Sequence, residues 1–402
     1  DPDFDINKAR LVTTAPRICV RYECVPMRFI KHVYKIHTYA QDGRLFEGKT
    51  PVSAFLNSSY DGSFIAGLME LRYIQSLPVE RIINYFESHG FTLKKPTAHK
   101  LMEKASSLFE NLYKCIRQTA LSDPYKAADE TYYKILVPEK NSKGKGVRKG
   151  YLWVVVGINT RMIYLLYDDG SRSEKVILNE LGGCKGIIQS DGYSPYRKLE
   201  SDAYPHITRI PCLQHIKRKF IDCGEDDPDA KRIVEMINTL YQNEHKHKIG
   251  VDGWTVEQNL VHRKKYAPDI LGEIKDVLDD IEERGDLLPK SELKEAITYL
   301  RNEWNAVVDI FNYGDTYLDN NIVERMNRYI SLSRKNSLFF GSHKGAERGA
   351  ILYTIALTCR MNKVNLFEYL TDVINRTAEW QPNTPLEKYR QLLPDRWEKA
   401  ND

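Results

Sequence analysis

The sequence predicts an α/β protein in which a sheet carries the functional residues and helices surround it. Three observations lead to this prediction. Residues 53–122 show helical periodicity, residues 123–221 are dominated by strand-like runs, and residues 222–312 return to charged amphipathic helices. The chain has 402 residues, of which 42% are hydrophobic. It is therefore long enough for two to four structural units with sizeable cores.

The first 52 residues are expected to form a short β segment. The runs ICVRYECV and RFIKHVYKIHTYA, between residues 18 and 40, alternate apolar and polar positions. Residues 41–52 are polar and rich in turn-forming residues, which indicates a linker.

Residues 53–122 are predicted to be helical and to contact DNA. Two helices, over 77–90 and 95–121, each begin near a proline, and Gly90 ends the first. Two helices joined in this way resemble a helix-turn-helix. A plain helical hairpin is the alternative interpretation. The residues expected near DNA are Thr97, His99 and Lys100.

Residues 123–221 are predicted to form the sheet. The expected elements are three strands (YKAADETYYKILV, YLWVVVGIN, MIYLLYDDG), a helix from Ser173 to Leu181, a strand (GIIQSDGY), a helix from Ser194 to Leu199, a strand (ITRIPCL) and a basic helix (HIKRKF). This order is that of a ribonuclease-H-like domain.

The rest of the chain would complete that domain around an insertion. Residues 222–312 form the helical insertion, and the second part of the core follows over residues 313–362 with a helix at 319–334. Residues 341–349 are expected to be a basic, glycine-rich turn region, and residues 363–402 a C-terminal tail.

Three carboxylates are the candidate catalytic residues. Asp129 lies in a strand between apolar flanks, where a carboxylate is costly unless it is paired or binds metal. Asp191 ends the next buried strand, and the predicted fold brings both aspartates to one edge of the sheet. Glu324 lies about one turn into a helix that Asp319 or Asn320 can cap. Three such acids would bind Mg²⁺ or Mn²⁺, and two ions about 3.5–4 Å apart can promote phosphoryl transfer.

Each acid also has a structural interpretation. Asp129 could accept hydrogen bonds at a strand end, with Glu130 as a rival ligand. Asp191 could cap the following turn, and Glu324 could pair with Arg328 at the i,i+4 spacing.

Several sequence blocks resemble the insertion sequence 66 family of bacterial DDE transposases, from about Ser53 to the C-terminus. The blocks are ADET at 128–131, QSDGY at 189–193, CLQHIKRKF at 212–220, DNNIVER at 319–325, RKN at 334–336 and GSHKGAER at 341–348. The resemblance implies a DNA transposase with a ribonuclease-H-like core and an insertion ahead of the glutamate. Its catalytic acids would be Asp129, Asp191 and Glu324, and the 133 residues between the last two (324 − 191) fit that arrangement.

The resemblance also places a Cys-x-x-His element on Cys212 and His215. This spacing could be half of a zinc site, but no second pair follows, so a structural or DNA-facing role for His215 is expected. The Cys-rich zinc-binding segment that family members usually carry before the helical region has no cysteines here, around KIHTYAQDG. Residues 1–52 therefore look like a degenerate form of that segment, and no zinc is expected.

Basic residues near these blocks are expected to grip DNA phosphates; for those at 217–219 a solvated helix face is the alternative. Trp153, Tyr193 and Tyr196 could stack on bases or belong to the core. The basic residues are Lys217, Arg218, Lys219, Arg325, Arg328, Arg334, Lys335 and Arg348.

Composition limits the location and the partners. The net charge of +4 does not by itself indicate nucleic acid, and seven scattered cysteines favour a reducing cytosol. Apolar runs are short and the start is no signal peptide, although the missing initiator Met suggests a processed or incomplete N-terminus. We expect a bacterial, cytoplasmic, nucleoid-associated protein without membrane contact, which acts on transposon ends and target DNA as a homodimer or higher oligomer. The alternatives are a ribonuclease-H-like nuclease without strand transfer and a domesticated, non-catalytic DNA-binding protein.

Overall fold

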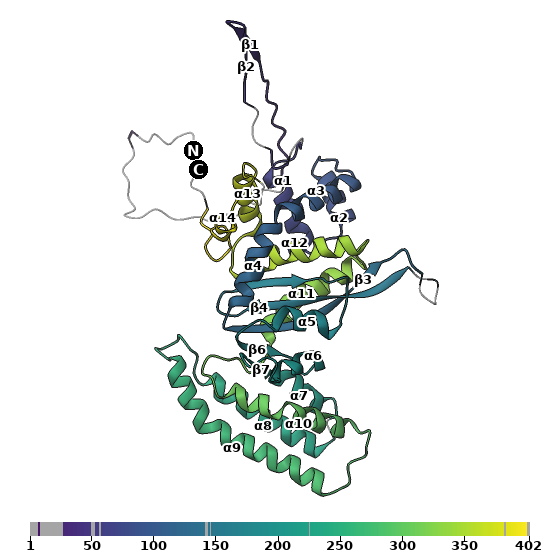
Figure 1. The fold of residues 1–402 in the computed structure, drawn as a ribbon, viewed down its shortest axis with the longest axis vertical. Coiled ribbons are helices and arrows are strands. Elements are labelled where there is room, and N and C mark those ends of the chain that lie inside the picture. Colours follow the sequence, from purple (N-terminus) through teal and green to yellow (C-terminus); the bar gives the residue numbers. More distant parts are fainter. Residues whose placement is uncertain are drawn as a thin grey trace.

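The structure is a computed structural model that describes residues 7–8, 27–49, 53–55, 58–140, 144, 146–224, 226–381 and 383–399. A central sheet lies between two groups of helices (Figure 1). One group comes from the first and last parts of the chain, and the second group lies at the opposite end of the molecule. Among the described helices, none combines the length and the apolar character needed to cross a membrane.

The central sheet is mixed and has five strands in the order β5-β4-β3-β6-β7. The strands β3, β4 and β5 are antiparallel neighbours, whereas β6 runs parallel to both β3 and β7. The succession of three strands, helix, strand, helix and strand agrees with the sequence prediction. The elements are β3 (Tyr125–Leu136), β4 (Val147–Gly157), β5 (Met162–Leu166), α5 (Glu174–Leu181), β6 (Gly186–Ser190), α6 (Ser194–Arg197) with the 3₁₀ turn η2 (Lys198–Glu200), and β7 (Ile207–Pro211).

The sheet forms because its central strands are covered on both faces. The run Trp153 to Val156 in β4 is fully buried, as is typical of a strand between two layers of helices. At the start of β6, Gly186 has a φ of +88°, and a Cβ there would lie 2.2 Å from the Pro124 carbonyl oxygen. Only glycine fits this position, which fixes where β6 joins the sheet beside β3.

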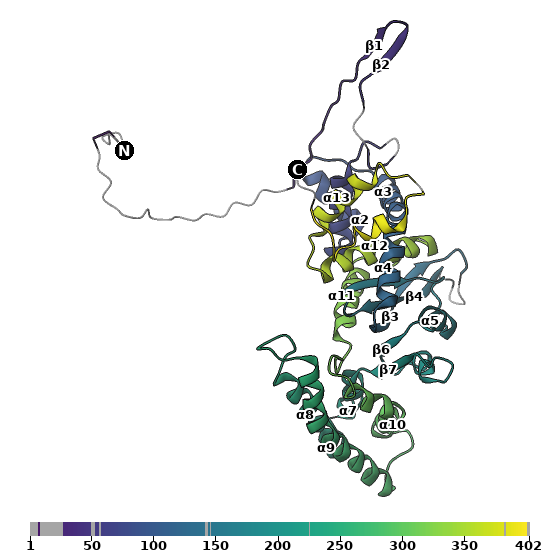
Figure 2. The ribbon, with the colours of Figure 1, turned by 60° about the vertical axis from the view of Figure 1, so that its left-hand side comes forward.

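One side of the sheet is covered by helices from both ends of the chain (Figure 2). Thr354 of α12 accepts a hydrogen bond from the Leu165 amide of β5, and Tyr113 of α4 donates to the Leu165 carbonyl, both at 2.9 Å. The elements of this group are α1 (Gly62–Met69), the π-helical turn η1 (Glu70–Ile74), α2 (Val79–Ser88), α3 (Lys95–Leu108), α4 (Glu110–Ser122), α12 (His343–Met361), α13 (Leu366–Thr377) and α14 (Leu386–Arg390).

Three helical predictions need correction. The helix expected over 95–121 is two helices, because the buried Phe109 leaves helical geometry (φ −89°, ψ 4°). The turn region expected at 341–349 is mostly the start of α12, which Ser342 caps by accepting from the Gly345 amide. The segment expected to be a tail contains α13 and α14 and packs on the body, where Arg390 of α14 donates to the Gln118 side chain of α4 at 2.9 Å.

The region between β7 and α11 (Asn321–Asn336) is helical, in agreement with the sequence. Its helices form a second hydrophobic core, which also contains Tyr125, Ile187 and Ile210 of the sheet. The elements are α7 (Leu213–Ile221), α8 (Pro228–His245), α9 (Val256–Glu283) and α10 (Glu292–Ile310).

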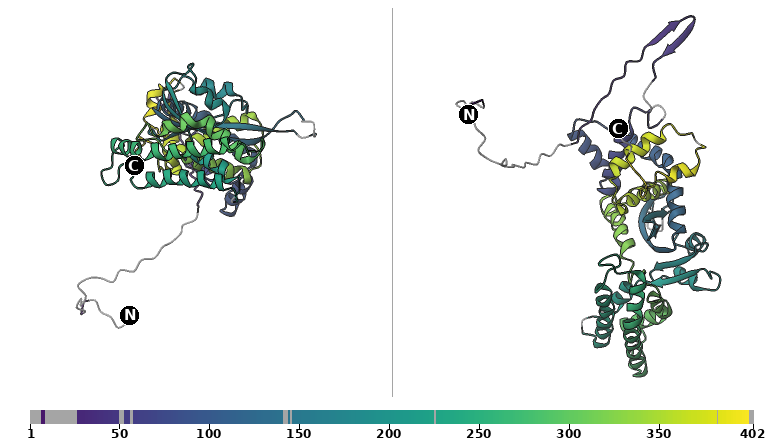
Figure 3. Two further views of the ribbon diagram at one scale, coloured as in Figure 1. Left: turned by 90° about the horizontal axis from the view of Figure 1, so that it is seen from below. Right: turned by 90° about the vertical axis from the view of Figure 1, so that its left-hand side faces the viewer.

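The N-terminal strands differ from the prediction. Within the described residues before α1, the strands are β1 (Thr38–Gln41) and β2 (Arg44–Glu47), joined by Asp42 and Gly43 at positive φ. Residues 28–37 are not strands, and residues 18–26 lie outside the described residues. The hairpin projects away from the body, and its residues are exposed (Figure 3). Its alternating apolar side chains therefore have no core in which to be buried.

Candidate active site

The first two candidate acids lie at matching positions on neighbouring strands. The last paired residues of β3 and β6 are Ala127 and Gln189. Asp129 and Asp191 each lie two residues further along, so the parallel register brings them to the same edge. This is the juxtaposition of aspartates that the sequence predicted.

Asp129 is held by two hydrogen bonds. The Asn327 side chain donates to Asp129 Oδ2 at 2.6 Å, and the Glu130 amide donates to Oδ1 at 2.8 Å. Burial raises the pKa of Asp129 to about 8, the charges of Glu130 and Asp191 act in the same direction, and the two hydrogen bonds oppose them. A buried carboxylate of this kind loses its proton readily only if a cation compensates its charge.

Glu130, the rival ligand, is occupied by other partners. Its carboxylate pairs with Arg172 at 2.5 Å and accepts from the Tyr196 hydroxyl at 3.3 Å. Tyr196 and Trp153 are fully buried and pack edge to face, so both belong to the core and are not free to stack on bases.

The position of Glu324 follows from the helix face on which it lies. Asn320, just before α11, donates to the Ala128 carbonyl at 3.0 Å, and Asn327 reaches Asp129. Further along the same face, Arg334 donates to the Tyr132 carbonyl. Glu324 is four residues after Asn320 and three before Asn327, so its Cα lies on the face that contacts β3 beside Ala128 and Asp129.

The carboxylate of Glu324 has two further neighbours, which come from the start of α7. His215 Nε2 lies 3.9 Å from Glu324 Oε1. Among the described residues, one group of three potential metal ligands is close enough to hold a single ion: Cys212, His215 and Glu324. Their ligand atoms lie within 4.8 Å of one another. Asp129 and Asp191 are not members of this group.

Cys212 is almost completely buried and tied to the segment that leads into α11. Its sulfur accepts from the Asn320 amide at 3.2 Å. Burial raises the pKa of the Cys212 thiol to about 12, and the amides of Asn320, His215 and Gln214 partly oppose that rise.

Four polar atoms at this place are buried and have no hydrogen-bond partner among the described residues. Each would ordinarily be satisfied by a partner, an ordered water or a cation, because a buried polar atom without one is costly. Oxygen atoms predominate among them, as the ligand preference of Mg²⁺ or Mn²⁺ requires. The unsatisfied atoms around Glu324 therefore suit a divalent ion, and none of them belongs to Asp129 or Asp191. The atoms are Glu324 Oε1, Asn327 Oδ1, Asn320 Oδ1 and His215 Nδ1.

The turn that carries Asp191 is anchored by the insertion. The Tyr299 hydroxyl of α10 accepts from the Gly192 amide at 2.8 Å, and a Cβ on Gly192 would lie 2.5 Å from that oxygen. Arg209 of β7 donates to the Asp191 carbonyl at 2.8 Å and pairs with Glu303 of α10 at 2.5 Å. The side chains of Arg209 and Glu303 are 0% and 1% exposed.

A second buried network holds the loop before α11. The Tyr125 hydroxyl donates to Gln189 Oε1 at 2.6 Å and accepts from the Tyr317 amide. The Gln189 amide donates to the Pro211 and Tyr317 carbonyls. Because Gln189 is two residues before Asp191, this network joins both aspartate strands to the segment that leads to Glu324.

The predicted DNA-contacting residues fall into three sets: those that pair within the chain, those that are half-buried and those that are exposed. Two are occupied within the chain: Arg334 lies over the Tyr132 ring at 3.9 Å, and Arg348 pairs with Glu103 at 2.8 Å. Thr97 is half-buried on α3, and Lys217 is half-buried on α7, 5.9 Å from the Tyr241 ring. The exposed residues are Lys100, Arg218, Lys219, Arg325, Arg328 and Lys335.

Sequence reasoning missed the residues that orient the acids. Gln189 and Asn320 lie inside the blocks QSDGY and DNNIVER, close in sequence to Asp191 and Glu324. A side-chain amide near each acid could have indicated a residue that orients the site. Asn327 follows Glu324 by three residues, which is the spacing of one helix face. Tyr299 and Glu303 carry no such signal, because they lie in the insertion more than 100 residues after Asp191 (299 − 191 = 108).

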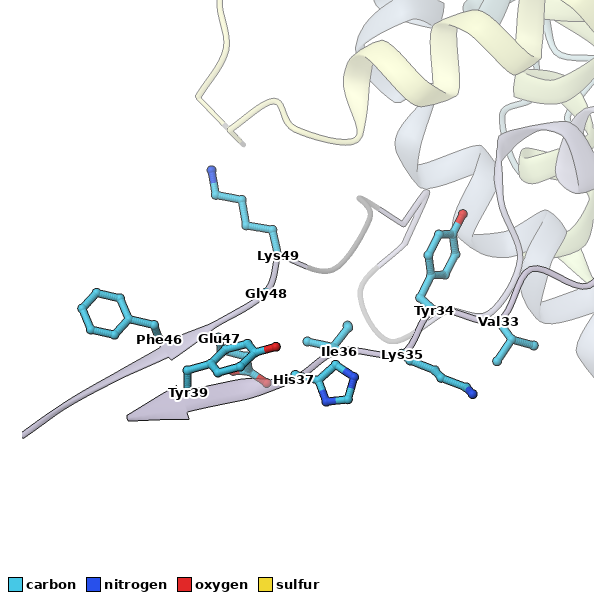
Figure 4. Close-up of a pocket in the computed structure, with 10 residues that line it drawn as sticks. All are labelled: Val33, Tyr34, Lys35, Ile36, His37, Tyr39, Phe46, Glu47, Gly48 and Lys49. Carbon is cyan, nitrogen blue, oxygen red and sulfur yellow. The ribbon is translucent and has the colours of Figure 1, made fainter. Parts of the chain in front are cut away.

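A hollow of about 620 Å³ lies at the base of the β1–β2 hairpin (Figure 4). Its lining residues are exposed, and Glu47 is the one acid among them. It therefore offers no group of carboxylates comparable to that at the sheet edge.

Comparison with known proteins gives a family. A model of the transposase IS66 family matches residues 57–348. The uncharacterized protein y4jD of Sinorhizobium fredii (strain NBRC 101917 / NGR234) is 26% identical over 346 residues, which cover 83% of this chain and 65% of that protein. The uncharacterized protein y4hP of the same strain is 24% identical over 441 residues, which cover 100% of this chain and 77% of that protein. The chain thus spans just under two thirds of the length of y4jD. With more than half of its residues matched by the family model, the chain belongs to the transposase IS66 family.

Proposed function

We propose that this protein is a DNA transposase that cleaves the ends of an insertion sequence and joins them to target DNA. The observation that carries the proposal is the convergence of Asp129, Asp191 and the Glu324 helix at one sheet edge. Membership of the family supports the same conclusion.

We also propose that the sheet and its helices are a ribonuclease-H-like core. The strand order β5-β4-β3-β6-β7, with antiparallel pairing on one side and parallel pairing on the other, supports this assignment. In such a core the acids would lie where the parallel pairing of β3 and β6 stops, at the carboxyl end of β6, which is the usual kind of place for a site in an α/β sheet.

The three acids would hold Mg²⁺ or Mn²⁺, which supplies activation of the attacking hydroxyl and stabilisation of the leaving oxygen. The chain itself supplies positioning. Asn327 orients Asp129, and the Tyr299 and Arg209 contacts fix the turn that carries Asp191. Fixed positions matter because correct orientation removes much of the entropic barrier in phosphoryl transfer.

DNA would be held by the exposed cations that flank the acids. Arg325 and Arg328 are exposed on α11 near Glu324. Arg218 and Lys219 are exposed on α7 shortly after His215. Lys100 and Lys335 are exposed candidates further away, and the α2–α3 pair remains a proposed helix-turn-helix. Two copies would act together, because transposition must join two DNA ends; the mass of the protein–DNA complex measures this directly.

The test is a strand-transfer assay with pre-cut transposon ends and Mg²⁺ or Mn²⁺. The variants Asp129→Asn, Asp191→Asn and Glu324→Gln should lose joined product and keep end binding. Glu273→Gln, which changes an exposed acid of the insertion, is the matched control and should retain activity. Full activity in any of the three acid variants would exclude that acid. Metal-dependent cleavage without joining would support the nuclease alternative, and no cleavage by the wild-type protein would support the non-catalytic one.

A further inference from the structure

We propose that Cys212, His215 and Glu324 form a binding site for a zinc-class transition-metal ion, which fixes the start of α7 to α11. This goes beyond the proposed function, because transposition by the three acids does not require a thiol or an imidazole. It also differs from the sequence expectation, which favoured a structural or DNA-facing role for His215 because no second pair of ligands follows Cys212 and His215. The third ligand is Glu324, 109 residues after His215 (324 − 215).

The geometry needs only a small contraction to bind an ion. The ligand atoms lie within 4.8 Å of one another, and His215 Nε2 is 3.9 Å from Glu324 Oε1. Zinc bonds of about 2.0–2.3 Å at tetrahedral angles place ligand atoms roughly 3.3–3.8 Å apart. The 3.9 Å separation is too long for a hydrogen bond, so the imidazole and the carboxylate do not satisfy each other in this way.

The polar atoms of the site point to a ligand. Glu324 Oε1 and His215 Nδ1 are buried and have no hydrogen-bond partner among the residues described. The two side chains as a whole are 23% and 29% exposed, so an ion can reach them from solvent. A bound cation would compensate Glu324 Oε1, which otherwise carries an uncompensated desolvation cost.

The surroundings of the sulfur suit a metal thiolate. Cys212 is the N-cap residue of α7, where backbone amides point toward negative charge. Its Sγ accepts from the Asn320 amide at 3.2 Å. Metal binding releases the thiol proton to solvent, and the thiolate that forms keeps this donated hydrogen bond.

The ligand types select the metal. One thiolate, one imidazole and one carboxylate suit Zn²⁺ and its spectroscopic substitute Co²⁺, whereas Mg²⁺ prefers oxygen ligands alone. Three protein ligands also leave a coordination position open. Occupation would tie the Glu324 carboxylate to the start of α7.

The experiment is a Co²⁺ titration of the chelator-treated full chain, followed by absorbance. The expected result is one equivalent of saturable binding, with a thiolate-to-cobalt charge-transfer band that Zn²⁺ removes and Mg²⁺ does not. Cys212→Ser should abolish the band, and His215→Ala and Glu324→Gln should weaken Co²⁺ binding at least about tenfold. Cys223→Ser is the matched control, because Cys223 is another cysteine near the end of α7 outside the group, and it should leave the band unchanged.

Three outcomes would overturn the proposal: no charge-transfer band in the wild-type protein, a band that persists in Cys212→Ser, or a wild-type affinity in both His215→Ala and Glu324→Gln. If Cys212→Ser fails to fold, as circular dichroism would show, the His215→Ala titration decides alone, since that side chain is partly exposed. The proposed function fails separately. The variants Asp129→Asn and Asp191→Asn should keep the cobalt band and lose strand transfer.

Discussion

The pair Arg209–Glu303 offers the sharpest test of the idea that the insertion positions the turn that carries Asp191. The perturbation is Glu303→Leu, which removes the carboxylate and leaves a side chain of similar size. Arg209 would then keep Glu200, the Asp191 carbonyl and Ser190 Oγ as partners. The guanidinium itself is 0% exposed, so water cannot replace the lost carboxylate.

The expected cost follows from that burial. Removing one partner of a buried ion pair costs about 3–5 kcal/mol. The lower end applies here because Glu200, whose side chain is 36% exposed, still pairs with Arg209. A loss of about 3 kcal/mol corresponds to a fall in melting temperature of roughly 6–12 °C, at about 2–4 °C per kcal/mol for a large domain.

The assay is thermal unfolding followed by circular dichroism, with Arg209→Met and the double variant Arg209→Met/Glu303→Leu beside the single one. The double variant should regain most of the stability, because an apolar pair of similar volume replaces a buried ion pair at little cost. It should still lose strand transfer, since a methionine side chain in place of Arg209 cannot donate to the Asp191 carbonyl. A Glu303→Leu protein within about 1 kcal/mol of wild type, or a double variant as unstable as the sum of the two single ones, would refute the reasoning.

Three further predictions concern the site itself. Since the folded pKa of Asp129 is raised from 3.8 to about 8, its contribution to the stability of the metal-free protein is full below pH 4 and is lost as the pH rises to about 8. The unfolding free energy of wild type should therefore fall relative to Asp129→Asn by up to about 6 kcal/mol across that range, and a constant difference in urea titrations would contradict the assignment. Asn327→Ala removes a hydrogen bond that lowers the pKa of Asp129, so the pH at half-maximal cleavage should move upward; an unmoved pH–rate profile would mean that another group titrates. Gly192→Ala would press a Cβ against the Tyr299 hydroxyl, so joined product should decrease while the melting temperature changes little, and unaltered joining would show that the turn tolerates the displacement.

Local patterns in the sequence predicted much of the sheet. The apolar runs of β4 and β6 are buried on both faces, so hydrophobicity alone identified them. Their order placed Asp129 and Asp191 at one edge, and the observed register agrees. The amphipathic helices of the insertion were also predicted, because each buries one apolar face in a shared core.

The parts that the sequence did not predict depend on contacts between distant segments. The alternation in residues 28–37 is typical of strands, but these residues are exposed and have no sheet to join. Glycines at 341, 345 and 349 suggested a turn, yet the Ser342 cap and the burial of Gly349 under Phe340 favour a helix. The proximity of His215 to Glu324 could not be predicted either, because it arises only when α7 and α11 meet.

The contacts along α11 imply that a change in chain length has different consequences in different parts of this protein. Asn320, Asn327 and Arg334 each contact β3 from one face of α11, on which Glu324 also lies. The spacing of residues along this helix is therefore fixed by the strand. One inserted residue would rotate everything after it by about 100° and move Glu324 or Asn327 away from β3. The length of the segment between Asp191 and Asn320 is not set by this helix face, although Tyr299 within it contacts Gly192. In relatives of other lengths, the counterpart of Glu324 should therefore be identified by its place on this helix and not by its distance from the second aspartate.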